Sequence, residues 1–319
     1  MYFLFQLLVA SALVGTSLGK CLSQYDTPAM PLPWTQPLCL DGPQQMEGNA
    51  VTIAQNLLMN DPSSIAYYPS KFAVSGTYNA ATNQAVQAFQ TVHKLTVNGV
   101  LDSATAQALL DCCSEDGIED DGFTASSLGY LYKISIPVTS NRSVEVVASL
   151  FDKDNNFIMS FPVRAHGHRD DNGPWPWPDF GSTPPDFGLN QFTSNGNTVT
   201  GIFEIDLNSP EPNSELYGPW PVNRLVRGLK GNAAWLTPNI RDGMLIHTGN
   251  WTTEATGPWT PADAMPNSSG CLHSHPDSVE KIYKELLALG VAVHENPFSG
   301  KNYPFTPQGI AVIYSIPIA

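Results

Sequence analysis

Positive charge is scarce in this chain. Its 319 residues include 15 Lys and Arg against 29 Asp and Glu, which gives a formal charge of −14. Nucleic acids and anionic lipid surfaces are bound through clusters of Lys and Arg, so this balance opposes either of them as a general partner. We therefore expect no nucleic-acid partner and attribute the acidic balance to solubility.

Long apolar runs are absent beyond the first residues of the chain. No later stretch approaches the roughly 18 uninterrupted apolar residues that cross a bilayer. The uncharged run from Tyr2 to Val14 is followed by Ser17-Leu18-Gly19, whose small residues suit a signal peptidase. We interpret residues 1–19 as a signal peptide and expect a secreted, extracellular protein without membrane insertion.

Cysteine is also sparse, with five residues in the chain. Two lie before one segment and two after it: Cys21, Cys39, Cys112 and Cys113. An exported chain keeps disulfides, and adjacent cysteines rarely bridge each other, so we expect the first pair to bond to the second with the connectivity left open. Cys271 is then unpaired, which makes it a candidate nucleophile.

Three Asn-x-Ser/Thr triplets begin at Asn141, Asn250 and Asn267. They are candidate glycosylation sites if the host has a eukaryotic secretory pathway. Such triplets also arise by chance, so they leave the host open, and with it the choice between a self and a foreign substrate.

The segment between the paired cysteines contains an internal repeat. Residues 76–86 and 99–109 share the pattern Gly-x4-Ala-Thr-x2-Ala-aliphatic. Each copy predicts a turn on glycine, a polar cap at Asn79 or Asp102, and a helix with one apolar face. With a further helix over 51–58, the repeat predicts a small all-α domain of three helices.

The motifs of this segment occur in a characteristic order. They are Val74-Ser75-Gly76-Thr77-Tyr78, Ala85-Val86-Gln87-Ala88-Phe89-Gln90 and Leu95-Thr96-Val97-Asn98-Gly99-Val100. The series resembles the peptidoglycan-binding domain that accompanies cell-wall enzymes. The resemblance assigns residues 48–113 to that domain, after an N-terminal extension over 20–47, and implies peptidoglycan as the partner. A generic three-helix bundle is the alternative.

The residue composition changes after the helical segment. Residues 114–128 are acidic and small with little to bury, which predicts a solvated linker. Residues 144–151 and 157–164 are rich in strand-forming residues and flank Asp, Lys and Asn at 152–156, which predicts a β-hairpin.

Residues 129–319 carry mostly strand patterns. Further strands are expected over 198–206, 243–247, 291–295 and 310–316. One helix is expected over 277–289, with Asp277 as its N-cap and Gly290 as its stop. The sequence therefore predicts a mostly-β, α+β domain of the sandwich or barrel kind.

The surroundings of Cys271 favour a nucleophile. A cysteine nucleophile needs a base and hydrogen-bond donors for an oxyanion. Backbone amides around Ser269 and Gly270 are the candidate donors, and His247, at a predicted strand end, is the candidate base. The field at the start of the 277–289 helix would favour the thiolate if the two lie close together.

Two runs of sequence around these residues carry a second resemblance. They are Ile246-His247-Thr248-Gly249 and Ser268-Ser269-Gly270-Cys271-Leu272-His273. The pair resembles the catalytic signature of L,D-transpeptidases of the YkuD type, as does Trp251 four residues after the histidine. The resemblance covers residues 129–319. It implies acyl transfer from a peptide stem to an amine or to water, with no cofactor or metal.

The same resemblance implies the roles of single residues. Cys271 would be the nucleophile and His247 its base, while Thr248, Trp251 and His273 would contact substrate. We expect the protein to act as a monomer.

Two departures leave the acceptor open, and so the choice between cross-linking and trimming. His247 and Cys271 are separated by 24 positions, which is longer than most members of the family show. His273 stands where that family usually has Arg or Asn.

Other interpretations of these residues stay open. Cys271 could be a buried structural thiol and His247 a core histidine, in which case the chain is a peptidoglycan-recognition protein without activity. Cys271, His273 and His275 could also join His247 in a zinc site, which would indicate a zinc-dependent cell-wall hydrolase.

Overall fold

The fold is taken from a computed structural model. It describes residues 40, 49–61, 63–64, 74–102, 104–106, 108–109, 118–139, 142–167, 196–238, 240–251, 260 and 263–316. The predicted signal peptide, nearly all of the extension, Asn141 and the four cysteines expected to form disulfides lie outside these residues. In the part of the chain described, no helix is long and apolar enough to cross a membrane.

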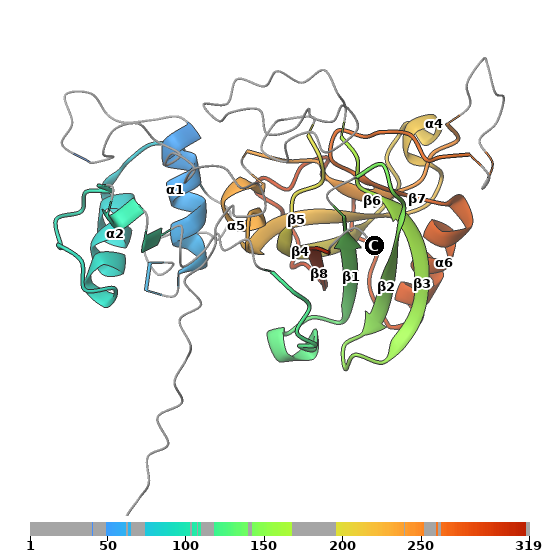
Figure 1. Ribbon diagram of the computed structural model, residues 1–319, viewed down its shortest axis with the longest axis horizontal. Coiled ribbons are helices and arrows are strands. Elements are labelled where there is room, and N and C mark those ends of the chain that lie inside the picture. The colour runs from blue at the N-terminus through green and yellow to red at the C-terminus, as the bar shows by residue number, and fades with distance from the viewer. Residues whose placement is uncertain are drawn as a thin grey trace, which may run out of the picture.

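The N-terminal part is helical, as predicted (Figure 1). Helices α1 (Asn49–Asn60) and α2 (Ala80–Val92) pack together, and residues 104–106 and 108–109 are helical too. The side chain of Asn79 caps α2 by accepting from the Thr82 amide at 3.0 Å, and Asp102 caps the last helix in the same way. Both predicted caps are confirmed.

Two buried glutamines carry the sequence repeat into the structure. Gln55 accepts from the amide of Gly76 at 2.9 Å and donates to the Thr82 hydroxyl at 2.8 Å. Gln90 makes the equivalent pair of bonds in the second copy. In each copy, a glutamine of the preceding helix ties the glycine turn to the next helix.

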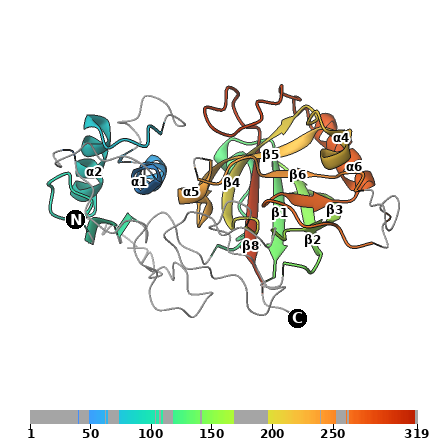
Figure 2. The ribbon, with the colours of Figure 1, turned by 90° about the horizontal axis from the view of Figure 1, so that it is seen from above.

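The C-terminal part is a closed eight-stranded barrel (Figures 1 and 2). Its strands are β1 (Tyr132–Val138), β2 (Val146–Asp152), β3 (Phe157–Arg164), β4 (Gly201–Asn208), β5 (Val222–Lys230), β6 (Leu245–His247), β7 (Leu272–Ser274) and β8 (Gly309–Ser315). They follow the order β1-β2-β3-β7-β6-β5-β4-β8. The pairs β1/β8 and β6/β7 are parallel and the others antiparallel. The predicted mostly-β domain is confirmed, in its barrel form.

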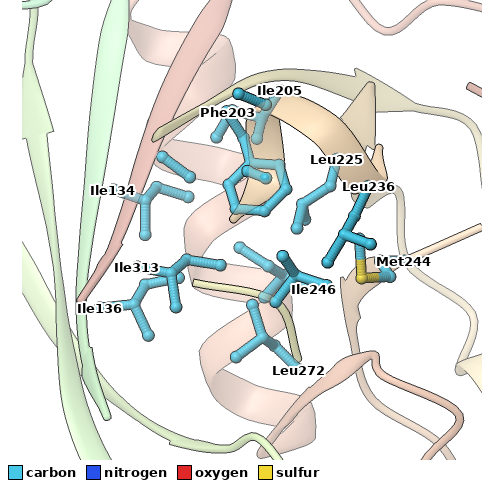
Figure 3. Close-up of a cluster of buried hydrophobic side chains, with 14 of the residues drawn as sticks. Ile134, Ile136, Phe203, Ile205, Leu225, Leu236, Met244, Ile246, Leu272 and Ile313 are labelled. Atoms are coloured by element: carbon cyan, nitrogen blue, oxygen red, sulfur yellow. The ribbon is translucent and has the colours of Figure 1, made fainter. Parts of the chain in front are cut away.

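The interior of the barrel is apolar (Figure 3). Phe203 of β4, Leu225 of β5, Ile246 of β6 and Leu272 of β7 point into it and are fully or almost fully buried. Because side chains alternate along a strand, the neighbours of these residues point outward. Cys271 therefore lies on the outer side of the barrel wall.

Short elements cover the outside of the barrel. They are η3 (Ser126–Leu128), α4 (Ser214–Tyr217), α5 (Ala233–Leu236) and α6 (Pro276–Ala288). Helix α6 packs near β3, and α5 contacts both β5 and α1. The contact between α5 and α1 joins the helical part to the barrel (Figure 2).

The structure corrects two of the element predictions. Helix α6 begins at Pro276 with His275 as its N-cap residue, so the expected cap at Asp277 is wrong. Proline suits the first helical position because its missing N–H would have no helical partner there. The expected strand over 291–295 is also absent, because a single bridge to β4, at His294, is its only strand-like pairing.

The expected linker is partly packed on the barrel. Ile118 and Ala125 are buried, and Asp120 forms an ion pair with the buried Lys133 of β1 at 3.0 Å. Residues 118–128 are therefore held against the barrel at these positions, while Glu119, Asp121, Gly122 and residues 126–128 are exposed. The acidic run in the sequence does not reveal this contact, because the buried partner of Asp120, Lys133, lies in the following strand.

Candidate functional site

The parallel pairing of β6 and β7 brings two distant segments together. His247 lies opposite His273, and Ile246 lies opposite Leu272. Cys271 precedes Leu272 and so shares the outer face with both histidines. His247 is its diagonal neighbour across the two strands, at a separation of about 7–8 Å that side chains span. The long sequence between His247 and Cys271 does not keep them apart.

A short hydrogen-bonded turn holds the nucleophile. The Ser268 hydroxyl accepts from the Gly270 amide at 3.1 Å and donates to the Cys271 carbonyl at 2.7 Å. The amide of Gly270, expected to be an oxyanion donor, is therefore engaged within the turn. The Ser269 side chain is exposed. Sequence reasoning selected Ser269 as a site residue, whereas Ser268 forms these bonds.

Arg241 is buried beneath this turn. Its guanidinium donates to the carbonyls of Gly196 at 3.1 Å, Asn197 at 3.3 Å and Ser269 at 3.4 Å. A Cβ atom at Gly270 would lie 2.2 Å from Nη2 of Arg241, and Gly270 has a φ of +103°. Position 270 therefore requires glycine both for its backbone conformation and for the close approach of the guanidinium.

The Cys271 thiol is neutral in this arrangement. It is a free thiol on a partly exposed residue, and it donates to the Gly243 carbonyl at 3.6 Å. Burial of the sulfur raises its pKa to about 11, although a backbone bond to Leu245 and nearby arginines lower it. Within the residues the structure covers, no hydrogen bond joins the sulfur to His247.

His247 is a buried, neutral imidazole. Its Nδ1 lies 2.6 Å from the Thr248 carbonyl, and a carbonyl only accepts, so Nδ1 carries the hydrogen and Nε2 is left with its lone pair. Burial, followed by the neighbouring His273, lowers the pKa of His247 to about 3. The ring of Tyr217, from α4, lies 4.9 Å from the imidazole.

Two aromatic rings complete this face. The His273 ring lies edge-on to His247 at 4.7 Å, and its Nδ1 donates to the Pro266 carbonyl at 2.8 Å. The Trp251 ring lies 4.9 Å from His273 on another side. His273 and Trp251, both selected from the sequence, are therefore part of one cluster with His247.

The remaining expected site residues lie around this cluster. Thr248 is buried, and its hydroxyl has no hydrogen-bond partner. Asn250 is exposed, whereas Asn267 is half-buried and accepts from Arg164 at 2.9 Å. Of the two described sequons, the one at Asn250 has the more open side chain.

The start of helix α6 is not close to the nucleophile. Strand β7 runs between Cys271 and Pro276, so the extended chain carries the helix about 15 Å away. The field of a helix end falls off within its first turn. The expected activation of Cys271 by this helix is therefore wrong.

Three residues of the zinc hypothesis, Cys271, His247 and His273, share one face of the barrel, and the fourth is His275. His275 lies at the start of α6, where its Nε2 is 3.9 Å from Glu145. Within the described ranges, no group of three or more His, Cys, Asp or Glu side chains is arranged to hold a metal ion. The geometry gives no support to a zinc site here.

Sequence reasoning missed four residues close to the nucleophile. They are Glu211, Tyr217, Arg224 and Arg241. The one available signal was the presence of arginines in a chain poor in cations, with Arg224 inside the run Val222–Lys230, which mixes apolar and charged residues. Glu211 and Tyr217 precede that run in a segment with no pattern of its own.

The comparisons with known proteins concern both parts of the chain. Residues 47–109 match the family described as a putative peptidoglycan binding domain. This match confirms the first resemblance, which assigned residues 48–113. No curated protein matches the chain.

Three solved structures show similarity over most of the chain. An L,D-transpeptidase from Xylanimonas cellulosilytica DSM 15894 is 15% identical, with a TM-score of 0.29, 90% of this chain and 98% of that chain covered. One from Stackebrandtia nassauensis is 13% identical, with a TM-score of 0.28 and coverage of 86% and 96%. A fused Zn-dependent amidase/peptidase/peptidoglycan-binding domain-containing protein from Clostridium acetobutylicum ATCC 824 is 14% identical, with a TM-score of 0.25 and coverage of 88% and 99%.

These similarities carry no argument about chemistry at such scores. The segment that matches the peptidoglycan-binding family, residues 47–109, is followed in the chain by the mostly-β barrel.

Proposed function

We propose that this chain is a secreted enzyme that acts on peptidoglycan by cysteine-dependent acyl transfer, of the L,D-transpeptidase or L,D-carboxypeptidase type. Cys271 is the nucleophile and His247 manages the proton. The observation that carries the proposal is the parallel pairing of β6 and β7, which gives both residues one outer face of the barrel. The peptidoglycan-binding domain supports the choice of substrate.

The mechanism begins from two neutral groups. The thiol turns away from the Gly243 carbonyl and passes its proton to Nε2 of His247 as the sulfur attacks a carbonyl of the stem peptide. Collapse of the tetrahedral intermediate releases the leaving amine, which takes the proton from the imidazolium. An incoming amine or water then attacks the thioester and regenerates the thiol.

The electrostatics of the resting site keep both groups neutral. A pKa of about 3 for His247 means that the base is free at neutral pH, and a pKa of about 11 for Cys271 means that the thiol is not ionised in advance. Proton transfer and attack then accompany each other. The helical domain raises the local concentration of stems by holding the enzyme on the polymer.

A peptidoglycan-recognition protein without turnover is the second candidate. The observation that favours it is the thiol's bond to Gly243 in place of one to His247. Modification with a carbapenem distinguishes the two: rapid, stoichiometric acylation of Cys271 supports the enzyme, whereas an inert thiol in a protein that still binds polymer supports recognition alone.

A further inference from the structure

A buried ion pair lies on the same face of the barrel as the nucleophile. Nη2 of Arg224 is 2.7 Å from Oε1 of Glu211, and the two side chains are 1% and 10% exposed. Arg224 lies opposite Leu245 in the β5/β6 pair, and Leu245 is in turn the residue of β6 beside position 271. Arg224 and Cys271 therefore flank Leu245 across two strand spacings of about 4.8 Å each.

The hydrogen bonds of the Arg224 guanidinium to the described residues involve two of its three nitrogens. Its Nε donates to Asn208 at 3.0 Å, and Nη2 donates to Asn296 at 2.8 Å as well as to Glu211. Among the described residues, Nη1 is buried and has no hydrogen-bond partner.

The two charges act on the thiol with opposite sign. Burial has the largest effect on the pKa of Cys271. In addition, Arg224 lowers this pKa and Glu211 raises it. The same charges act on the hydroxyl of Tyr217. Its pKa is raised first by burial and then by Cys271 and Glu211. Arg224 thus favours the thiolate and Glu211 opposes it.

Other charged and titratable groups face Cys271. Arg241 approaches from beneath the nucleophile's turn, Tyr217 comes from α4, and His247 and His273 stand on β6 and β7. Arg241 also favours the thiolate, but it bonds to the backbone of the turn itself. A substitution of Arg241 would move the sulfur as well as remove a nearby charge. Substitutions in the Arg224–Glu211 pair therefore test the effect of charge more directly.

We propose that the buried Arg224–Glu211 pair, beside the strand face that carries Cys271, modulates the reactivity of this nucleophile, with Arg224 favouring the thiolate form and Glu211 opposing it. This inference rests on the proposed function, in which Cys271 is the reacting group. Arg224 and Glu211 act through the thiol and are positioning residues.

The pH dependence of Cys271 alkylation by iodoacetamide tests the proposal in the full chain. Glu211→Gln should lower the midpoint by about one pH unit and raise the rate at neutral pH roughly tenfold, and Arg224→Gln should raise the midpoint by a similar amount. Both variants break the same ion pair. A merely structural role would therefore move the two midpoints in the same direction.

A second buried pair gives a matched control. Arg227 lies on β5, as Arg224 does, and pairs with Glu204 of β4, with Nε and Oε2 3.0 Å apart. Arg227→Gln and Glu204→Gln should leave the midpoint unchanged. Arg224→Lys, which keeps the charge, should restore most of the shift caused by the glutamine and covers the case in which Arg224→Gln fails to fold.

The outcomes separate this inference from the function beneath it. Opposite shifts of the alkylation midpoint in Glu211→Gln and Arg224→Gln support the inference. If Arg224→Gln does not fold, a lowered midpoint in Glu211→Gln together with an unshifted midpoint in Arg224→Lys supports it. Shifts of one sign, or none, in a reactive Cys271 overturn the inference and leave the proposed function standing. A folded wild type whose Cys271 resists alkylation at every pH overturns both.

Discussion

The helical domain and the barrel site are held together by different kinds of contact. In the helical domain, a glutamine of the preceding helix fixes each copy of the repeat, as Gln90 does with Gly99 and Thr105. In the barrel, the site unites Cys271 with His247 and Arg224 from separate strands. A repeat pattern therefore describes its own structure, whereas the site depends on strand pairing that no local pattern specifies.

Removing the thiol should have the largest effect and separate the two regions completely. Cys271→Ala should abolish turnover of peptidoglycan because no other group of the site can form the thioester. Binding to insoluble polymer, measured by pull-down, should match wild type because it belongs to the helical domain. Product release at the wild-type rate would contradict the assignment of the nucleophile.

Burial of neutral His247 should make the barrel sensitive to acid. Its pKa in the folded state, about 3, lies below the ordinary value of 6.5, so the stabilisation is present above pH 6.5 and is lost as the pH falls toward 3. The shift corresponds to roughly 5 kcal/mol. Urea unfolding of wild type and His247→Gln between pH 7 and pH 4 measures the part lost over that range, roughly 3 kcal/mol.

The difference between these two proteins isolates the histidine from the carboxylates that titrate in the same range. The free energy of unfolding should fall more steeply with acid in wild type than in the variant. Parallel curves would show that His247 is not held neutral by burial.

Gly270→Ala should damage the site more than an equivalent change elsewhere. A methyl group there would meet Arg241 as well as a φ of +103°, so we expect a loss of about 2–4 kcal/mol and slower alkylation of Cys271. Gly290 has a φ of +82° with nothing within 4 Å of an added Cβ. Gly290→Ala is the matched control and should cost about 1 kcal/mol with an unchanged alkylation rate. Equal losses in the two variants would show that the Arg241 contact has no effect.

The smallest effect should stay within the helical domain. Gln90→Leu leaves the buried partners of the glutamine unsatisfied, which should cost about 1–3 kcal/mol and weaken polymer binding. Gln84 is exposed on the same helix, so Gln84→Leu is the control and should be neutral. Alkylation of Cys271 should be unaffected in both, and a change there would mean that the two regions are coupled through α1 and α5.

The sequence predicted the parts of the fold that local chemistry controls. The cap at Asn79, the stop at Gly290 and the hairpin around 152–156 all follow from residues with strong backbone preferences. Strands β1, β5 and β7 were not predicted. Strand β7 has only three residues, too few to show a period.

The candidate site was predictable only where a motif carried it. His247, His273 and Trp251 came from a resemblance and lie together. Arg224 and Glu211 carry no motif, and their place depends on the register of β5 against β6 and on a segment without regular structure. Pairing across strands is a property of the folded barrel, so single-sequence patterns do not contain it.

The central claim is that Cys271 is a working nucleophile. The most direct test incubates the protein with a soluble peptidoglycan fragment that bears a stem peptide, traps the thioester with acid, and maps its position by mass spectrometry. The account predicts an acyl adduct on Cys271 in wild type and none in Cys271→Ala. An unmodified Cys271 in a protein that still binds and releases the fragment would contradict it.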